Sequence, residues 1–219
     1  MINRHNDSIK LVKDLIRIDF TLNQEERELL SHVYKSKADL CRSSLRTVRA
    51  LLDNESICES ENRKSELIKL RFEISKELQD ICQDIVSILD DMLIPNAKNP
   101  EFEVYYIKLK ADYYRYWSES CLAEEKERLA KLSREFYISS LEKSSSSLSK
   151  DNPIYLGSVL NYTVFLFEIA GEKKAALDLL VLTYNSAPKN DEESEEKTRV
   201  LQTMKDNITL WSEEQGSVN

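Results

Sequence analysis

Residues that interrupt helices are almost missing from this chain. It has 3 glycines and 4 prolines in 219 residues, and its apolar residues recur at the spacing of one helix face, as they do between Leu67 and Ile88. Three glycines are too few for a glycine-rich nucleotide-binding loop such as GxGxxG, and no such motif occurs. The sequence therefore predicts an all-α protein, an antiparallel bundle of amphipathic helices joined by short turns.

Caps and prolines indicate where the helices begin and end. Asn23 precedes an acidic first turn, Pro153 has the favoured first position of a helix, and Gly171 follows a last turn. We expect a loop at residues 144–152 and a mobile acidic link at residues 189–197. The predicted helices span residues 6–20, 24–53, 60–93, 100–121, 124–141, 153–170, 173–185 and 198–211.

Length and charge limit the partners that this chain can have. We expect residues 1–211 to form a single domain, followed by a short flexible tail at residues 212–219. The chain has 39 acidic and 31 basic residues, a net charge of -8, which argues against binding nucleic acid or an anionic membrane surface. No apolar run is long enough to span a membrane and no signal peptide pattern is present, so we expect a cytoplasmic protein.

Motifs for catalysis and for metal binding are missing from the sequence. The chain has 2 histidines and 4 cysteines, with no HExxH, CxxC or GxSxG motif. Glu28 and His32 have the spacing of a ligand pair, but such a pair is more often a surface contact. We therefore expect a protein that is not an enzyme, that needs no metal and no cofactor, and whose cysteines are free thiols.

Two predicted helices each carry a pair of cations seven residues apart. The pairs are Lys35 with Arg42 and Lys108 with Arg115, and this spacing places both members of a pair on one face. Tyr116 adds a phenolic donor beside them. In an acidic chain, such a local group suits a small dianion, because arginine binds phosphate through two parallel hydrogen bonds. The pattern predicts a phosphoserine or phosphothreonine pocket, while the simpler alternative is a pair of solvated helix faces.

Two further helix faces each place an asparagine among apolar residues. An asparagine amide can pair with the backbone of an extended peptide, although both could equally be core or cap residues. We expect a concave amphipathic groove, with the cationic faces as one wall and these faces as the other. The residues of the two faces are Leu160, Asn161, Val164 and Glu168 on one helix, and Val200, Thr203, Asn207, Leu210 and Trp211 on the other.

Several long blocks of the sequence resemble the 14-3-3 family. They are VYYIKLKADYYRYWSE, NPIYLGSVLNYTVFLFEI and MKDNITLWSEEQG, together with NQEERELLSHVYK and LQDICQDIVSILDDMLIPNA. The resemblance runs in one order from about Leu22 to Gly216. It implies an all-helical, homodimeric adaptor that binds phosphorylated client proteins at phosphoserine or phosphothreonine motifs and regulates them by sequestration or clamping.

The resemblance also implies a role for each site residue. By position, the phosphate is held by Lys35, Arg42, Arg115 and Tyr116. The main chain of the client peptide is clamped by Asn161 and Asn207. The groove is lined by Lys108, Leu160, Val164, Glu168, Val200, Thr203, Leu210 and Trp211.

The sequence departs from the family pattern at the groove and at the dimer face. Arg199 and Thr203 stand where the family has aliphatic residues, which predicts an altered ligand preference. Only about one helix precedes Asn23, where the family has an additional first helix, so we expect a loose or open homodimer. Arg4 and Glu77 could still form one pair between subunits. These departures leave open a divergent helical protein of the same fold that has lost or altered client binding.

Overall fold

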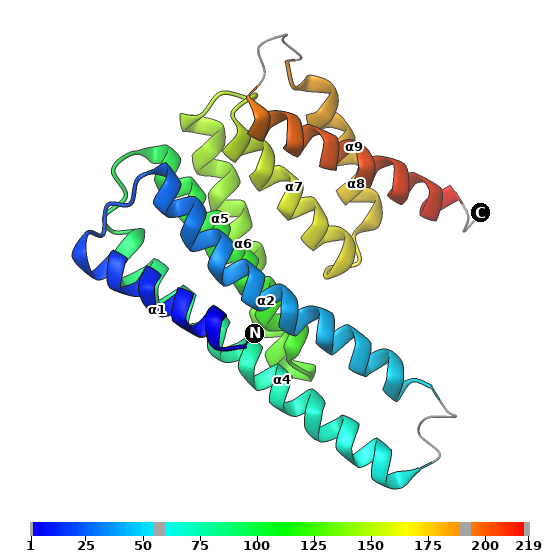
Figure 1. Ribbon diagram of the computed structural model, residues 1–219. Helices are drawn as coiled ribbons and strands as arrows, with labels where there is room; N and C mark the ends of the chain where they lie inside the picture. The colour runs from blue at the N-terminus through cyan, green and yellow to red at the C-terminus, as the bar shows by residue number, and fades with distance from the viewer. Residues whose placement is uncertain (1, 55–59, 189–193, 217–219) are drawn as a thin grey trace. The chain divides into compact units, whose positions relative to one another are not determined.

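The computed structural model describes residues 2–54, 60–188 and 194–216, with side chains from residue 6 onward. Throughout these residues every regular element is a helix, which confirms the all-α prediction. Figure 1 draws these helices as coiled ribbons, coloured from the N-terminus to the C-terminus. In chain order they are α1 (Ile2–Ile18), α2 (Gln24–Leu52), α4 (Glu61–Ile88), the π-helical turn η1 (Leu89–Leu93), α5 (Pro100–Ser120), α6 (Ala123–Ser147), α7 (Pro153–Glu168), α8 (Lys173–Ser186) and α9 (Glu195–Gly216).

The predicted cap of α2 is present, and α7 starts at Pro153 as predicted. The Asn23 side chain accepts a hydrogen bond from the Glu26 amide at 3.0 Å, and the Glu26 carboxylate accepts one from the Asn23 amide at 2.8 Å. This reciprocal pair satisfies two amides that a helix start leaves without partners. Asn152 caps α7 ahead of Pro153, and Gly171 follows that helix with a φ of +72°, which glycine adopts without strain.

The predicted end of α6 was wrong. The helix continues to Ser147 instead of stopping at Leu141. Its serine hydroxyls donate to carbonyls of the preceding turn, as Ser145 does to Glu142 at 2.9 Å and Ser147 does to Lys143 at 2.6 Å. The hydroxyls are therefore satisfied inside the helix, and only the second half of the predicted loop is irregular.

α9 is longer than predicted at both ends. It starts at Glu195, where the Ser194 hydroxyl accepts an amide hydrogen bond and two acidic residues occupy the first turn. It continues to Gly216, so the first half of the predicted tail is helical. The other residues of the predicted link and tail, 189–193 and 217–219, lie outside the described residues.

The chain divides into two compact units, and unit 1 is built around α2 and α4. Unit 1 takes in Tyr113–Leu129 and the described residues up to Ala97. In it α2 lies beside α4 (Figure 1) and buries Tyr34 completely. Asp84 of α4 accepts hydrogen bonds from the Lys13 ammonium at 2.5 Å and from the Tyr34 hydroxyl at 2.7 Å, so it ties both α1 and α2 to α4. Burial and this bond to Asp84 raise the pKa of Tyr34, so the phenol stays protonated.

Unit 2 has a separate core among its part of α5 and the helices α6, α7, α8 and α9. Unit 2 comprises Lys98–Asp112 and the described residues from Ala130 onward. α6 and α7 approach closely, with the hydroxyls of Ser140 and Ser158 3.2 Å apart. The fully buried members of the core are Ala111, Tyr137, Leu156, Ala176, Leu180 and Met204.

Each unit contains one of the chain's 2 tryptophans. In unit 1 the Trp117 ring is stacked parallel to Tyr114, with ring centroids 6.2 Å apart. In unit 2 the buried Trp211 ring stacks on Phe167 at 4.3 Å. Among the described helices, none is both long and apolar enough to cross a membrane.

Candidate functional site

Two arginines of unit 1 lie around one aromatic ring. The guanidinium carbon of Arg42 on α2 is 4.1 Å from the centre of the Tyr116 ring, and that of Arg115 on α5 is 4.7 Å away. Only 10% of the Arg42 side chain and 6% of the Arg115 side chain are exposed, so both charges have lost most of their hydration. Lys35 stands exposed on the same helix as Arg42 and forms no ion pair with any described residue.

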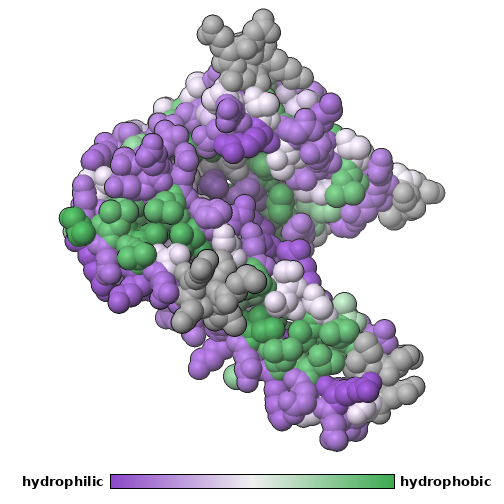
Figure 2. Space-filling view, in the orientation of Figure 1, coloured by the Kyte–Doolittle hydropathy of each residue, from purple (hydrophilic) through white to green (hydrophobic). Residues whose placement is uncertain are grey.

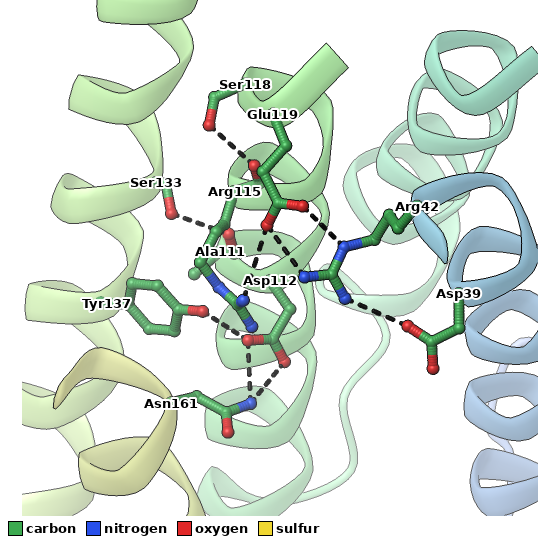
Figure 3. A network of polar contacts seen from close by, with 10 residues as sticks. All are labelled: Asp39, Arg42, Ala111, Asp112, Arg115, Ser118, Glu119, Ser133, Tyr137 and Asn161. Atoms are coloured by element: carbon green, nitrogen blue, oxygen red, sulfur yellow. Dashed lines mark hydrogen bonds and ion pairs between the residues drawn. The ribbon is translucent and has the colours of Figure 1, made fainter. Parts of the chain in front are cut away.

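The carboxylate of Glu119 lies between the two arginines and contacts both of them. Arg42 donates to both Glu119 oxygens, at 2.8 and 2.9 Å, and to Asp39 at 3.1 Å. Arg115 lies 3.9 Å from the same carboxylate, and dashed lines in Figure 3 mark the contacts of both arginines with Glu119. Burial alone would lower the pKa of Arg42, but the hydrogen bond and charge of Glu119 outweigh it, and the pKa is raised. Arg42 therefore stays charged in the site.

The sequence reasoning missed both acidic members of the cluster. Glu119 follows Arg115 by four residues, and Asp39 precedes Arg42 by three, spacings that place each pair on one helix face. That signal was available in the sequence. The bridge from Glu119 to Arg42 joins α5 to α2 and could not be read from spacing. Arg42 and Arg115 already contact Glu119, whereas Lys35, exposed on the same face of α2 as Arg42, forms no ion pair with a described carboxylate and so adds positive charge for an anion.

A second polar cluster, in unit 2, surrounds the buried carboxylate of Asp112. Asn161 on α7 donates from its amide to both Asp112 oxygens at 2.9 Å, as drawn in Figure 3. The Tyr137 hydroxyl also donates to this carboxylate, and the Lys108 ammonium lies 3.2 Å from it. The carboxylate thereby fixes the orientation of the Asn161 side chain, whose carbonyl oxygen is its remaining acceptor.

The predicted apolar wall belongs to α7 and α9 of unit 2, and its members differ in exposure. Leu160 and Trp211 are buried, and Val164 and Val200 pack against the same core. Asn207 is half-buried, whereas Glu168, Thr203 and Leu210 are exposed. The four predicted phosphate ligands belong to unit 1, and the other predicted site residues belong to unit 2.

No described residues group into a metal site. Within that part of the chain, no three histidine, cysteine or acidic residues are placed to hold an ion. Cys41, Cys82 and Cys121 are buried free thiols, and Cys58 lies outside the described residues. Burial of the Cys41 thiol raises its pKa to about 11, and the negative charge of Glu77 contributes to the same increase. This thiol is therefore protonated at neutral pH.

Comparison with known proteins gives one consistent result. A family profile described as 14-3-3 protein matches residues 1–212. The chain is 35% identical over 220 residues to 14-3-3 protein beta/alpha of Xenopus tropicalis, covering 97% of this chain and 89% of that protein. It is 36% identical to the Homo sapiens beta/alpha protein, covering 97% and 88%, and 34% identical to 14-3-3 protein zeta of Bombyx mori, covering 95% and 86%. Together with the all-helical fold and the arginine cluster, these matches establish that the chain belongs to the 14-3-3 family.

Proposed function

We propose that this protein is a non-enzymatic adaptor that binds client proteins phosphorylated on serine or threonine. The observation that carries the proposal is the cluster in unit 1, where Arg42 and Arg115 are almost fully buried around Tyr116 and Glu119. Membership of the 14-3-3 family supports the same role. Buried arginines that are held charged suit a phosphate, because charge-assisted hydrogen bonds strengthen where water is excluded.

In the proposed binding step, the phosphate joins a charge network that already exists. Glu119 and Asp39 hold the Arg42 guanidinium in one orientation, which lowers the entropy lost when the ligand binds. Lys35, which has no acidic partner among the described residues, supplies the charge that the phosphate dianion uses most directly. Arg115 and the Tyr116 hydroxyl complete the ligand set.

We assign the rest of the client peptide to α7 and α9. Asn161 is oriented by Asp112, so its carbonyl oxygen is placed to accept a hydrogen bond from a peptide amide. Asn207 is the corresponding group of α9. Side chains of the client would lie against a groove lining formed by Lys108, Leu160, Val164, Glu168, Val200, Thr203, Leu210 and Trp211. On this proposal the protein acts in the cytoplasm by sequestering or clamping clients, with no nucleic acid or membrane as partner.

We also propose a homodimer, formed through apolar surface of unit 1. Figure 2 shows such surface over α1 and again over the ends of α2 and α4. Leu11 is 69% exposed and Ile18 is 84% exposed on α1, and Leu51 and Leu70 line an open apolar hollow between α2 and α4. Large apolar side chains that are exposed together on a folded unit are typical of an interface.

The decisive experiment compares matched peptides by fluorescence anisotropy. A peptide with one phosphoserine should bind, and the same peptide without phosphate should not. Arg42→Ala removes the two charge-assisted hydrogen bonds that the guanidinium would donate to the phosphate. This variant should therefore bind the phosphopeptide at least about a hundredfold more weakly. Arg128→Ala is the control, because Arg128 makes the same two-pronged contact with Glu125 at 2.8 and 2.9 Å but is exposed and lies outside the cluster.

Equal binding of the two peptides would refute phosphate recognition. That outcome would favour the alternative, a divergent helical protein that has lost or altered client binding. Arg199 and Thr203, which are exposed on α9, support this alternative, because they place polar groups where an aliphatic contact surface is expected.

A further inference from the structure

Unit 1 has a second hollow that does not include the phosphate cluster. Its volume is about 570 Å³, within the range of sites that bind small ligands or a few side chains of a peptide. It lies among α2, α4 and the connection from α5 to α6. The residues that give it its character are Arg49, Ile68, Arg71, Phe72, Lys76 and Leu122.

The rim of this hollow is apolar where a helix surface is normally polar. Phe72 is 70% exposed, Leu122 is 73% exposed and Ile68 is 44% exposed. Phe72 and Ile68 are four residues apart on α4, so one face of that helix presents both. Large apolar side chains grouped at a hollow are typical of a surface that binds a partner.

The cations of the hollow are not neutralised by their surroundings. Arg71 and Lys76 form no ion pair with any described residue. Arg49 donates to the Glu119 carbonyl, which leaves its charge unbalanced. The acidic residue of the lining, Glu125, is already paired with Arg128 at 2.8 Å. In a chain with a net charge of -8, this local excess of positive charge would favour a negatively charged partner.

The turn beside the hollow contains a strained residue directly after the exposed Leu122. Ala123 has a φ of +47°, a left-handed conformation that costs a residue with a side chain about 1 kcal/mol. Strain of this kind persists where surrounding structure fixes it, and it gathers at functional sites. Here it begins α6 directly after Leu122, which points into solvent at the rim.

We propose that this hollow is a second docking site, which binds an unphosphorylated protein segment with large apolar side chains flanked by aspartate or glutamate. The apolar rim would bury the hydrophobic side chains, and Arg49, Arg71 and Lys76 would pair with the flanking carboxylates. A peptide fits better than an anionic membrane, because polar groups of Ser75, Gln79 and Ser120 also line the hollow and can bond to a peptide backbone. This site is independent of the proposed phosphopeptide site.

The test uses the full chain and a fluorescein-labelled hexapeptide in which Leu-Phe is flanked on each side by two acidic residues. The peptide should bind, and its affinity should fall as salt is raised. Lys76→Glu should weaken binding about tenfold, whereas Lys69→Glu, the same change on the same helix but outside the hollow, should alter it less than about twofold. Phe72→Ser should weaken binding at least about tenfold. Circular dichroism checks that each variant is folded, as expected for exposed positions.

Two further measurements distinguish this hollow from the phosphate cluster and from a membrane-binding surface. Arg42→Ala and a saturating phosphopeptide should leave hexapeptide binding unchanged; loss of binding in either case would mean that the acidic peptide occupies the phosphate cluster, and would overturn the proposal. Sedimentation with phosphatidylserine vesicles tests the membrane. Vesicle binding that Phe72→Ser abolishes, without any hexapeptide binding, would also overturn it, as would equal effects of Lys76→Glu and Lys69→Glu.

Discussion

At the scale of single residues, the most consequential side chain is Glu119. Its removal leaves Arg42 with Asp39 alone and takes the carboxylate away from Arg115. We expect Glu119→Gln to lower the free energy of unfolding by about 1–3 kcal/mol, because buried charges lose a partner. Phosphate should restore much of that loss by taking the place of the carboxylate. Thermal unfolding with and without inorganic phosphate measures both effects, and a loss of stability that phosphate does not reduce would contradict this role.

Arg199 carries a second prediction at this scale. It is exposed on α9, and the Thr203 hydroxyl donates to its carbonyl at 2.9 Å. If this face binds clients, Arg199→Leu adds apolar contact and should strengthen binding of a general 14-3-3 ligand by about 1 kcal/mol. Calorimetry with a matched phosphopeptide is the measurement, and Lys205→Leu on the same helix is the control. Unchanged affinity for Arg199→Leu would mean that the residue faces solvent in the complex.

The residues of the cluster also mark the limit of what spacing could predict. Lys35 and Arg42 could be placed on one face because a helix repeats in a fixed way. Glu119 could not be assigned to Arg42, because the two are 77 residues apart and their contact depends on how α2 packs against α5. The same holds for Asp112 and Asn161, which are 49 residues apart.

At the scale of helices, the capping residues allow a controlled comparison. Asn23 makes a full capping box at the start of α2, whereas Ser60 stands at the start of α4 with no side-chain hydrogen bond to it. Asn23→Ala should therefore cost about 1 kcal/mol, and Ser60→Ala should cost less than about 0.3 kcal/mol. Urea unfolding of the two variants measures the difference. Equal losses would mean that the cap of α2 contributes nothing beyond local helix preference.

Helix starts were easier to predict than helix ends for a physical reason. A start is specified by one polar side chain and the amides that follow, as at Asn23 and Asn152. An end depends on competition between local turns and packing. The serines at the end of α6 favour a turn in isolation but bond back to their own helix here. The segment Leu89–Leu93 was predicted as part of an ordinary helix, because π-helical winding does not change the spacing of its apolar residues enough to be recognised in the sequence.

At the scale of the whole molecule, unit 1 offers limited apolar surface for a homodimer. Val12 and Ile16 on α1 and Val48 on α2 are buried inside the unit, so they cannot contribute to an interface. Glu77, which could pair with Arg4 of another subunit, already pairs with Lys37 of its own chain, and the Arg4 side chain lies outside the described residues. The apolar surface that remains consists of the exposed apolar side chains on α1 and the hollow between α2 and α4. Stable dimers usually bury more than about 1,200 Å², so we expect a weak one.

Analytical ultracentrifugation over a dilution series measures the strength of that dimer. We expect dissociation at about micromolar concentration, where the binding free energy is about 8 kcal/mol. Glu73 is exposed on α4, three residues after Leu70 of the apolar hollow, so Glu73→Lys should strengthen association if an acidic residue of the other subunit lies opposite. A dimer that persists at nanomolar concentration would contradict the expected weakness. A monomer at every concentration would contradict the homodimer itself.

The separate tryptophans give the molecule an internal spectroscopic label for each half. Trp117 emits from unit 1 and Trp211 from unit 2, and each ring is stacked on a different aromatic neighbour. A Trp117→Phe variant would report melting of unit 2 alone, and a Trp211→Phe variant would report unit 1. Coincident melting curves would mean that residues 1–211 behave as one cooperative domain, as predicted, whereas separate curves would reveal two foldons that open independently. A client that bridges both halves should then raise the lower melting curve toward the upper one.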